Sequence, residues 1–129
     1  MVAFDSMPSH SVPDLTKQKA DRFFELRSYE SYSEKKGLDK IRMFNKGGEV
    51  AIFEEIGTDP VFFAQAITGD ERPNLLYMTT FADTTDHRKK WHAFRTHPTW
   101  LAIKGLPEYA NTVSKGHTYY LHPAEFSQL

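Results

Sequence analysis

Three residues near the start of the predicted domain have types and a spacing that could perform acid–base and anion-binding chemistry. Glu25, Arg27 and Tyr29 follow one another at intervals of two, so they share one face if the segment is a β-strand. On that face the carboxylate could act as a base, the guanidinium could clamp an anion, and the phenol could donate a proton. The alternative is a structural ion pair between Glu25 and Arg27 that fixes strand register or a dimer seam, because charges on a buried face are rarely left unpaired.

Two aromatic residues further along the chain could complete such a site. Tyr77 could line a pocket together with Tyr29, or it could be core mass whose hydroxyl is hydrogen-bonded. Trp91 belongs to an aromatic set whose helical spacing favours the core over a cofactor pocket. The resulting candidates are Arg27, Tyr29 and Tyr77 as catalytic residues, and Glu25 and Trp91 as ligand-binding residues.

One of the six histidines is a further catalytic candidate. His92 follows Trp91 on a predicted helix, with Arg88 and Arg95 about one turn away on either side. This spacing predicts that His92 lies on the border of the apolar face and points into a cleft between helix and sheet. The alternative is a half-exposed surface histidine. The spacings of the histidines place no two of them together as chelating ligands, so no metal site is predicted.

Composition excludes several classes of function. The chain has 129 residues, enough for one domain, and its 40% hydrophobic and 14% aromatic residues can fill a core. It has no cysteine, which excludes disulfides, thiolate zinc sites, iron–sulfur clusters and a cysteine nucleophile. A net charge of −1 lacks the basic field that drives non-specific nucleic-acid binding. No apolar run approaches the roughly 20 residues of a membrane helix, so we expect a soluble protein, with the cytoplasm as default compartment.

The apolar pattern predicts the elements that must position these side chains. Period-two alternation predicts a strand over 22–29, and a capping box at Ser31 and Glu34 predicts the start of a helix. We expect that helix to carry Leu38 and Phe44 on its apolar face. Residues 1–21 have no sustained period and are predicted to be a linker, which leaves 22–129 as the folded domain. The remaining expected elements are a helical segment over 49–56, strands over 61–68, 74–81 and 113–121, and helical segments over 84–96 and 100–103.

The order of these elements is that of a ferredoxin-like βαββαβ domain. We therefore predict an α+β fold in which a four-stranded antiparallel sheet has its helices on one face. The strands carry bulky residues on both sides, as in Phe62-Phe63, Tyr77-Met78 and Tyr119-Tyr120. Because a sheet that is apolar on both faces needs a second layer, we predict that it packs against another sheet, from a second copy or a second domain.

Four segments of the chain together resemble the NIPSNAP family. They are Phe24–Tyr29 (FELRSY), Arg72–Met78 (RPNLLYM), Trp91–Phe94 (WHAF) and Pro98–Trp100 (PTW). Their order and spacing carry the resemblance, which extends over 22–129. More narrowly, the chain resembles the C-terminal half of bacterial proteins with two such domains in tandem. In that case Ala3-Phe4 would be the tail of the preceding domain's last helix, and Met1 an expression start.

The resemblance implies a dimeric α+β barrel, formed by a homodimer or with a tandem sister domain. It implies no settled bacterial activity. Our first hypothesis is a non-enzymatic domain that pairs through its sheet and binds a small apolar or anionic ligand in its cleft, without a cofactor. The alternative, by analogy with related barrels, is a cofactor-independent or haem-dependent monooxygenase-like enzyme that uses His92, Arg27, Tyr29 and Tyr77.

Overall fold

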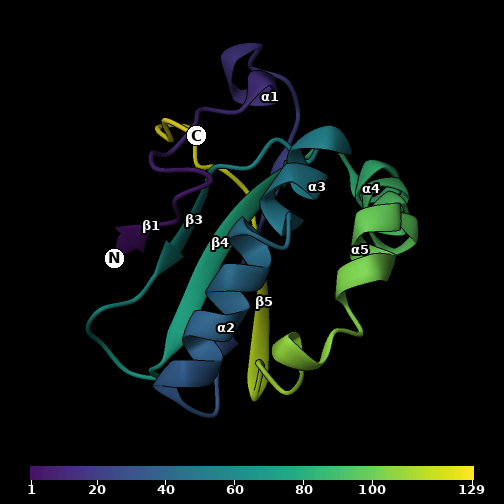
Figure 1. Ribbon diagram of the computed structural model, residues 1–129. Helices are drawn as coiled ribbons and strands as arrows, with labels where there is room; N and C mark the ends of the chain where they lie inside the picture. The colour runs from purple at the N-terminus through teal and green to yellow at the C-terminus, as the bar shows by residue number, and fades with distance from the viewer.

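The protein is built around one antiparallel sheet with helices on one side, as the computed structural model of residues 1–129 shows (Figure 1). The strand order across the sheet is β1-β3-β4-β2-β5. The strands are β1 (Val2–Ala3), β2 (Phe23–Glu30), β3 (Phe62–Gln65), β4 (Asn74–Phe81) and β5 (Lys115–Leu121). The helices are α1 (Asp14–Lys17), α2 (Glu34–Asn45), α3 (Glu49–Glu55), α4 (Thr84–Thr96) and α5 (Pro98–Ile103), followed by a 3-10 turn over Pro107–Tyr109. The expected βαββαβ order is present within this larger set.

The central strands follow the sequence pattern closely. The strand expected over 74–81 is β4 residue for residue, and β2 pairs with it over its whole length, from Phe23 opposite Phe81 to Glu30 opposite Asn74. Asp83 caps α4, because its side chain accepts a hydrogen bond from the backbone amide of Asp86. These two strands and this helix are the elements that carry the candidate site.

The N-terminal residues correct the prediction of a linker and of a four-stranded sheet. Val2 and Ala3 form a fifth strand that pairs with the outer edge of β3, and Phe4 is 2% exposed between Phe44 and Phe63. Ala3 and Phe4 are therefore strand and core residues, not the tail of a helix. A two-residue strand is too short to show a period, and its pairing satisfies backbone groups that β3 would otherwise leave open.

Helix α2 also differs from the expectation. Its N-cap is Ser33, whose hydroxyl accepts from the amide of Lys36, in place of a cap at Ser31. Leu38 is 51% exposed, while Phe44 is fully buried. Leu38 and Phe44 are six residues apart, which places them about 120° apart around the helix axis. Both side chains therefore cannot lie on one narrow face of α2.

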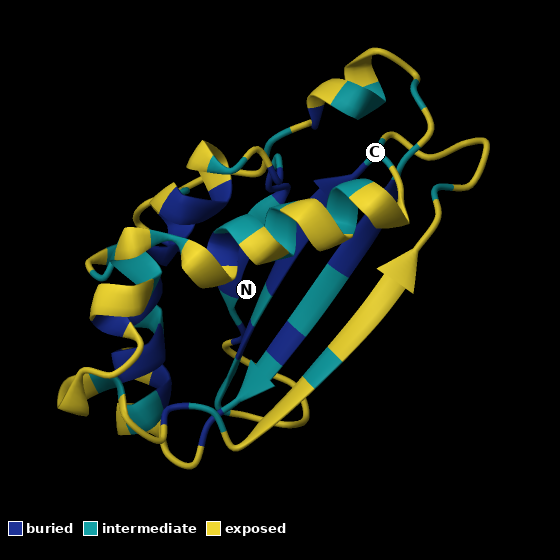
Figure 2. Ribbon diagram, turned by 90° about the vertical axis from the view of Figure 1, so that its right-hand side faces the viewer, coloured by how far each residue is buried: buried dark blue, intermediate teal, exposed yellow.

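The two faces of the sheet are covered differently. The face toward α2–α5 holds the main core, which consists of Phe4, Phe44, Val50, Ile52, Phe53, Phe63, Leu75, Tyr77 and Phe94. The opposite face, here called the distal face, holds a smaller cluster of Phe24, Val61 and Met78 with Leu26, Phe62 and Leu129 at its margin. Strand β5, at the edge of the sheet, is exposed along most of its length (Figure 2).

The helices of the chain are too short or too polar to cross a bilayer.

Candidate functional site

The predicted polar face of β2 is present, and Glu25 is its centre. Glu25 is fully buried. One carboxylate oxygen accepts from Nε of Arg27, two residues along the strand, and the other accepts from His87 Nε2 and from Trp91 Nε1, the latter at 3.0 Å. His87 and Trp91 are one turn apart on α4, so both reach the sheet from the helix layer.

Arg27 connects this carboxylate to a pair of tyrosines. Its Nη1 donates to the hydroxyl of Tyr29 at 3.2 Å, and that hydroxyl lies 2.9 Å from the hydroxyl of Tyr77 on the neighbouring strand β4. The Arg27 Cζ lies 4.1 Å from the ring centroid of Trp91, so the indole covers one face of the guanidinium. The result is a continuous hydrogen-bonded chain between the sheet and α4.

Burial changes the acidity of this chain. It raises the pKa of Tyr77 well above its usual value, with further contributions from Tyr29 that Arg27 partly opposes. Burial alone would lower the pKa of Arg27, but the oxygens of Tyr77, Tyr29 and Glu25 outweigh it and raise that pKa. Both groups therefore keep their protons at neutral pH, which leaves a cation and a hydrogen-bond donor side by side.

A cavity of about 250 Å³ opens beside this chain, between the sheet and the helices. Its lining residues are Arg27, Tyr29, Lys40, Glu49, Phe53, Tyr77, Trp91, Phe94, Arg95 and Trp100. Lys40 of α2 and Glu49 of α3 form an ion pair of 2.6 Å in its wall and are 7% and 4% exposed. Burial raises the pKa of Glu49, while Lys40 acts against that rise.

The structure brings together five of the six residues predicted from the sequence and leaves one apart. The five are Glu25, Arg27, Tyr29, Tyr77 and Trp91, all of which belong to the polar chain or the cavity wall. His92 is exposed and does not line the cavity, so the expected placement at the helix–sheet cleft is wrong. The roles assigned to the five residues stay predictions.

Among the polar residues that sequence reasoning missed are His87, Lys40 and Glu49. His87 had a readable signal, because it precedes Trp91 by four residues and Phe94 by seven, the spacing of one helical face. Lys40 and Glu49 had none, since they come from two helices separated by Gly47-Gly48 and each looks like an ordinary surface charge.

Haem does not fit this arrangement. His92, the histidine that the haem-dependent alternative would use, is at the surface, and the Nε2 of His87 is already bonded to Glu25. The cavity of about 250 Å³ lies below the roughly 300–1,000 Å³ of pockets for drug-sized ligands, and haem is larger than most of those. We expect a haemin titration to give the same visible spectrum for the natural chain and for His92→Ala. A Soret band that His92→Ala abolishes would revive the haem hypothesis.

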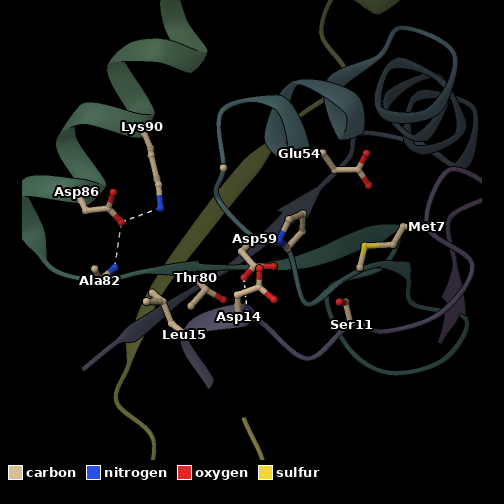
Figure 3. Close-up of a pocket in the computed structure, with 12 residues that line it drawn as sticks. Met7, Ser11, Asp14, Leu15, Glu54, Asp59, Thr80, Ala82, Asp86 and Lys90 are labelled. Atoms are coloured by element: carbon tan, nitrogen blue, oxygen red, sulfur yellow. Dashed lines mark hydrogen bonds and ion pairs between the residues drawn. The ribbon is translucent and has the colours of Figure 1, made fainter. Parts of the chain in front are cut away.

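A hollow larger than this cavity lies elsewhere and contains none of the predicted residues. It measures about 650 Å³ and is bordered by the N-terminal segment, the end of α3 and the start of α4 (Figure 3). Four carboxylates line it, but Asp86 is already held by Lys90 at 2.7 Å and by the amide of Ala82 at 3.0 Å (Figure 3). Its remaining carboxylates have no common ligand geometry.

A second polar group lies at the end of β2. Glu30, Glu71 and His117 each bring one potential metal-ligand atom to within 4.8 Å of the others. The sequence did not reveal this group, because Glu71 comes from the β3–β4 loop. His117 Nε2 lies 3.1 Å from Glu30, and Lys115 lies 4.0 Å from it. Glu30 therefore already has His117 and Lys115 of the protein beside its carboxylate.

The architecture is that of a ferredoxin-like α+β domain with an added edge strand and a polar chain on the helix-facing side of its sheet. The profile of the NIPSNAP family matches residues 24–128. The chain therefore belongs to the NIPSNAP family. Among curated proteins, none matches it.

Solved structures of bacterial NIPSNAP proteins have the same fold. A NIPSNAP family protein from Agrobacterium tumefaciens str. C58 is 17% identical and superposes with a TM-score of 0.70, over 84% of this chain and 91% of the other. A second protein from that organism gives 18% identity, 83% and 92% coverage, and a TM-score of 0.70. A NIPSNAP-like domain protein from Burkholderia xenovorans is 15% identical and superposes with a TM-score of 0.70, over 82% of this chain and 88% of the other. At these identities the likeness concerns the fold.

Proposed function

We propose that this NIPSNAP domain is a ligand-binding module whose site is the cavity between the sheet and α2–α5. The observation that carries the proposal is the polar chain from Glu25 through Arg27 to Tyr29 and Tyr77, which borders a cavity in which six of the ten lining residues are aromatic. A few convergent polar groups in a mostly apolar cavity are typical of small-molecule sites. Both oxygens of Glu25 are engaged by protein donors, which favours binding over a reaction that needs Glu25 as a free base.

The two tryptophans give a direct test of this binding function. Trp91 and Trp100 are the only tryptophans in the chain, and both line the cavity. A panel of small anions, cations and neutral aromatic molecules can be screened by the two indole N–H signals in NMR spectra. We expect at least one class of molecule to shift both signals in a saturable way. A panel that leaves both signals unmoved would refute the proposal.

The domain is further proposed to pair with a second copy through the distal face, which would complete an α+β barrel. Three apolar side chains support this pairing: Leu26 and Leu76 are partly exposed on that face, and Tyr119, opposite Leu26 on β5, is 50% exposed. Contiguous apolar surface on one face of a sheet is stabilised by a second layer. A sister domain in a longer chain could cover the distal face in the same way. The isolated chain distinguishes these two cases, because it dimerises only if two copies pair with each other.

Sedimentation tests the pairing. We expect the natural chain to sediment at twice its 14.9 kDa mass, and Leu26→Asp to sediment at 14.9 kDa, because a carboxylate cannot be buried unpaired between two sheets. The matched control is Leu38→Asp, which alters an exposed leucine of α2 and should leave the dimer intact. A natural chain that stays monomeric and unaggregated at micromolar concentration contradicts pairing between copies.

A further inference from the structure

We infer that the ligand of this cavity is a small aromatic carboxylate, with its anionic group on Arg27 and its ring among the aromatic walls. This inference rests on the proposed binding function and adds the chemical class of the ligand. It follows from the hydrogen-bond donors left without partners, from the charges of the lining residues, and from the size and composition of the cavity.

The guanidinium of Arg27 has N–H donors that no protein group accepts from. An arginine carries five N–H groups. The Nε–H of Arg27 donates to Glu25 and one Nη1–H donates to Tyr29, which leaves three N–H groups with no protein acceptor. Because Trp91 covers one face of the guanidinium, a ligand meets its edge, where two N–H groups can bind one carboxylate in parallel.

The tyrosine pair adds one more donor. Tyr29 and Tyr77 have two hydroxyl protons but share a single hydrogen bond, so one phenolic proton has no acceptor in the protein. Glu49 is the one carboxylate among the lining side chains, and Lys40 already holds one of its oxygens at 2.6 Å. The cavity therefore presents a surplus of donors, which an oxygen-rich ligand group would satisfy.

The charges of the lining residues point the same way. Three cations line the cavity, Arg27, Lys40 and Arg95, against one carboxylate. The ion pair of Lys40 with Glu49 cancels one charge of each sign, and the ion pair of Arg27 with Glu25 cancels another. The excess positive charge is that of Arg95, while Arg27 contributes N–H donors that no protein group accepts from. Arginine is charged at every working pH, so the site keeps an anion-binding group throughout.

The size and walls of the cavity favour a single ring. A volume of about 250 Å³ corresponds to roughly eight waters at about 30 Å³ each, which suits a molecule of the size of benzoate. Six of the ten lining residues are aromatic: Tyr29, Phe53, Tyr77, Trp91, Phe94 and Trp100. A bare inorganic anion would leave these walls without a partner, whereas an aromatic ring would stack against them.

The test compares three probes on the natural chain by tryptophan emission. Benzoate carries both proposed features, benzamide has the same ring without the charge, and inorganic phosphate has charge without the ring. We expect benzoate to change the emission in a saturable way. Benzamide and phosphate should each bind at least tenfold more weakly, because a charge-assisted bidentate bond or the ring contact is lost.

Two variants assign the anion to Arg27. Arg27→Gln should weaken benzoate binding at least tenfold, with Arg88→Gln as the matched control, an exposed arginine of α4 outside the cavity. If Arg27→Gln does not fold, Arg27→Lys keeps the charge beside Glu25 but loses the bidentate edge, and it should also weaken benzoate.

The outcomes separate this inference from the binding proposal. Benzamide binding as tightly as benzoate overturns the carboxylate and leaves the cavity as a binding site. Phosphate binding as tightly as benzoate overturns the aromatic part. Benzoate binding that survives both Arg27 variants overturns the role of Arg27. If no probe changes the emission, the inference fails here, and the wider NMR panel decides whether the binding function fails with it.

Discussion

Replacing Lys40 with methionine is expected to lower the free energy of unfolding by about 3–5 kcal/mol. Lys40 and Glu49 are both almost completely buried, and their 2.6 Å ion pair lies in the wall of the cavity. Methionine removes the cation and leaves the carboxylate of Glu49 buried with no partner, which is far more costly than the loss of a surface pair. Denaturant unfolding followed by far-UV circular dichroism measures the change.

Two further variants show that the loss comes from the pair. Lys40→Met combined with Glu49→Leu should return the stability to near that of the natural chain, because neither charge then remains to be buried. Lys35→Met changes a lysine of the same helix that is 80% exposed, and its partner Asp39 keeps a second ion pair with Arg42, so the effect of Lys35→Met should be much smaller. A Lys40→Met variant no less stable than Lys35→Met would show that the Lys40–Glu49 pair is not buried in solution.

The stability of Lys40→Met should increase as the pH falls. Burial already raises the pKa of Glu49 above its reference of 4.5, and loss of Lys40 removes the group that opposes this rise. In Lys40→Met the folded state therefore holds a proton on Glu49 at pH values where the unfolded state has lost it. The free energy of unfolding of Lys40→Met then increases as the pH falls through the pKa of Glu49 in the folded state toward 4.5. The difference in stability between the variant and the natural chain therefore becomes smaller at low pH. A deficit that does not vary with pH would contradict this account.

The polar face of β2 could be predicted from sequence, and the reason is geometric. Residues two apart on a strand must share a face, so Glu25, Arg27 and Tyr29 had to lie together once the strand was recognised. Their partner Tyr77 lies directly opposite Arg27 in the β2–β4 register. The strand period predicted the face, while the register between strands came only from the structure.

The helix side of the site was harder to predict because neighbours in sequence are not neighbours on a helix. His92 is adjacent to Trp91 in the chain, yet it points to solvent, while His87, four residues earlier, lies on the same face and reaches Glu25. Residues one apart on a helix are rotated by about 100°, which is enough to move a side chain from the core to the surface. A search at intervals of four and seven from Trp91 and Phe94 would have selected His87.

The contacts that no local pattern predicts are those between distant segments. Lys40 and Glu49 meet because α2 and α3 turn back on each other at Gly48, whose φ of +92° favours glycine. Phe4 enters the core only because β1 pairs with β3, where Val2 lies opposite Gln65 and Ala3 opposite Ala64. Such contacts depend on the tertiary arrangement, so periodicity within one element carries no information about them.

Glu25→Gln is expected to destabilise the fold by about 3–5 kcal/mol. Three donors converge on Glu25, from Arg27, His87 and Trp91, and all three need an acceptor. Glutamine offers one oxygen and an NH₂ group in place of two oxygens, so at least one buried donor faces another donor. The matched control is Glu30→Gln on the same strand. The partner of Glu30, His117, is near the surface, and losing this contact should cost at most about 1 kcal/mol.

The same substitution distinguishes a positioning role for Glu25 from a purely structural one. Folded Glu25→Gln protein, obtained in a stabilising buffer, has no carboxylate at the Nε of Arg27. A bound benzoate then no longer competes with Glu25 for the positive charge of the guanidinium. We expect benzoate to bind this variant more tightly than the natural chain, while Glu30→Gln leaves the affinity unchanged. Weaker benzoate binding in folded Glu25→Gln would mean that Glu25 is needed to aim the guanidinium at the cavity, and that its ion pair with Arg27 is part of the binding site.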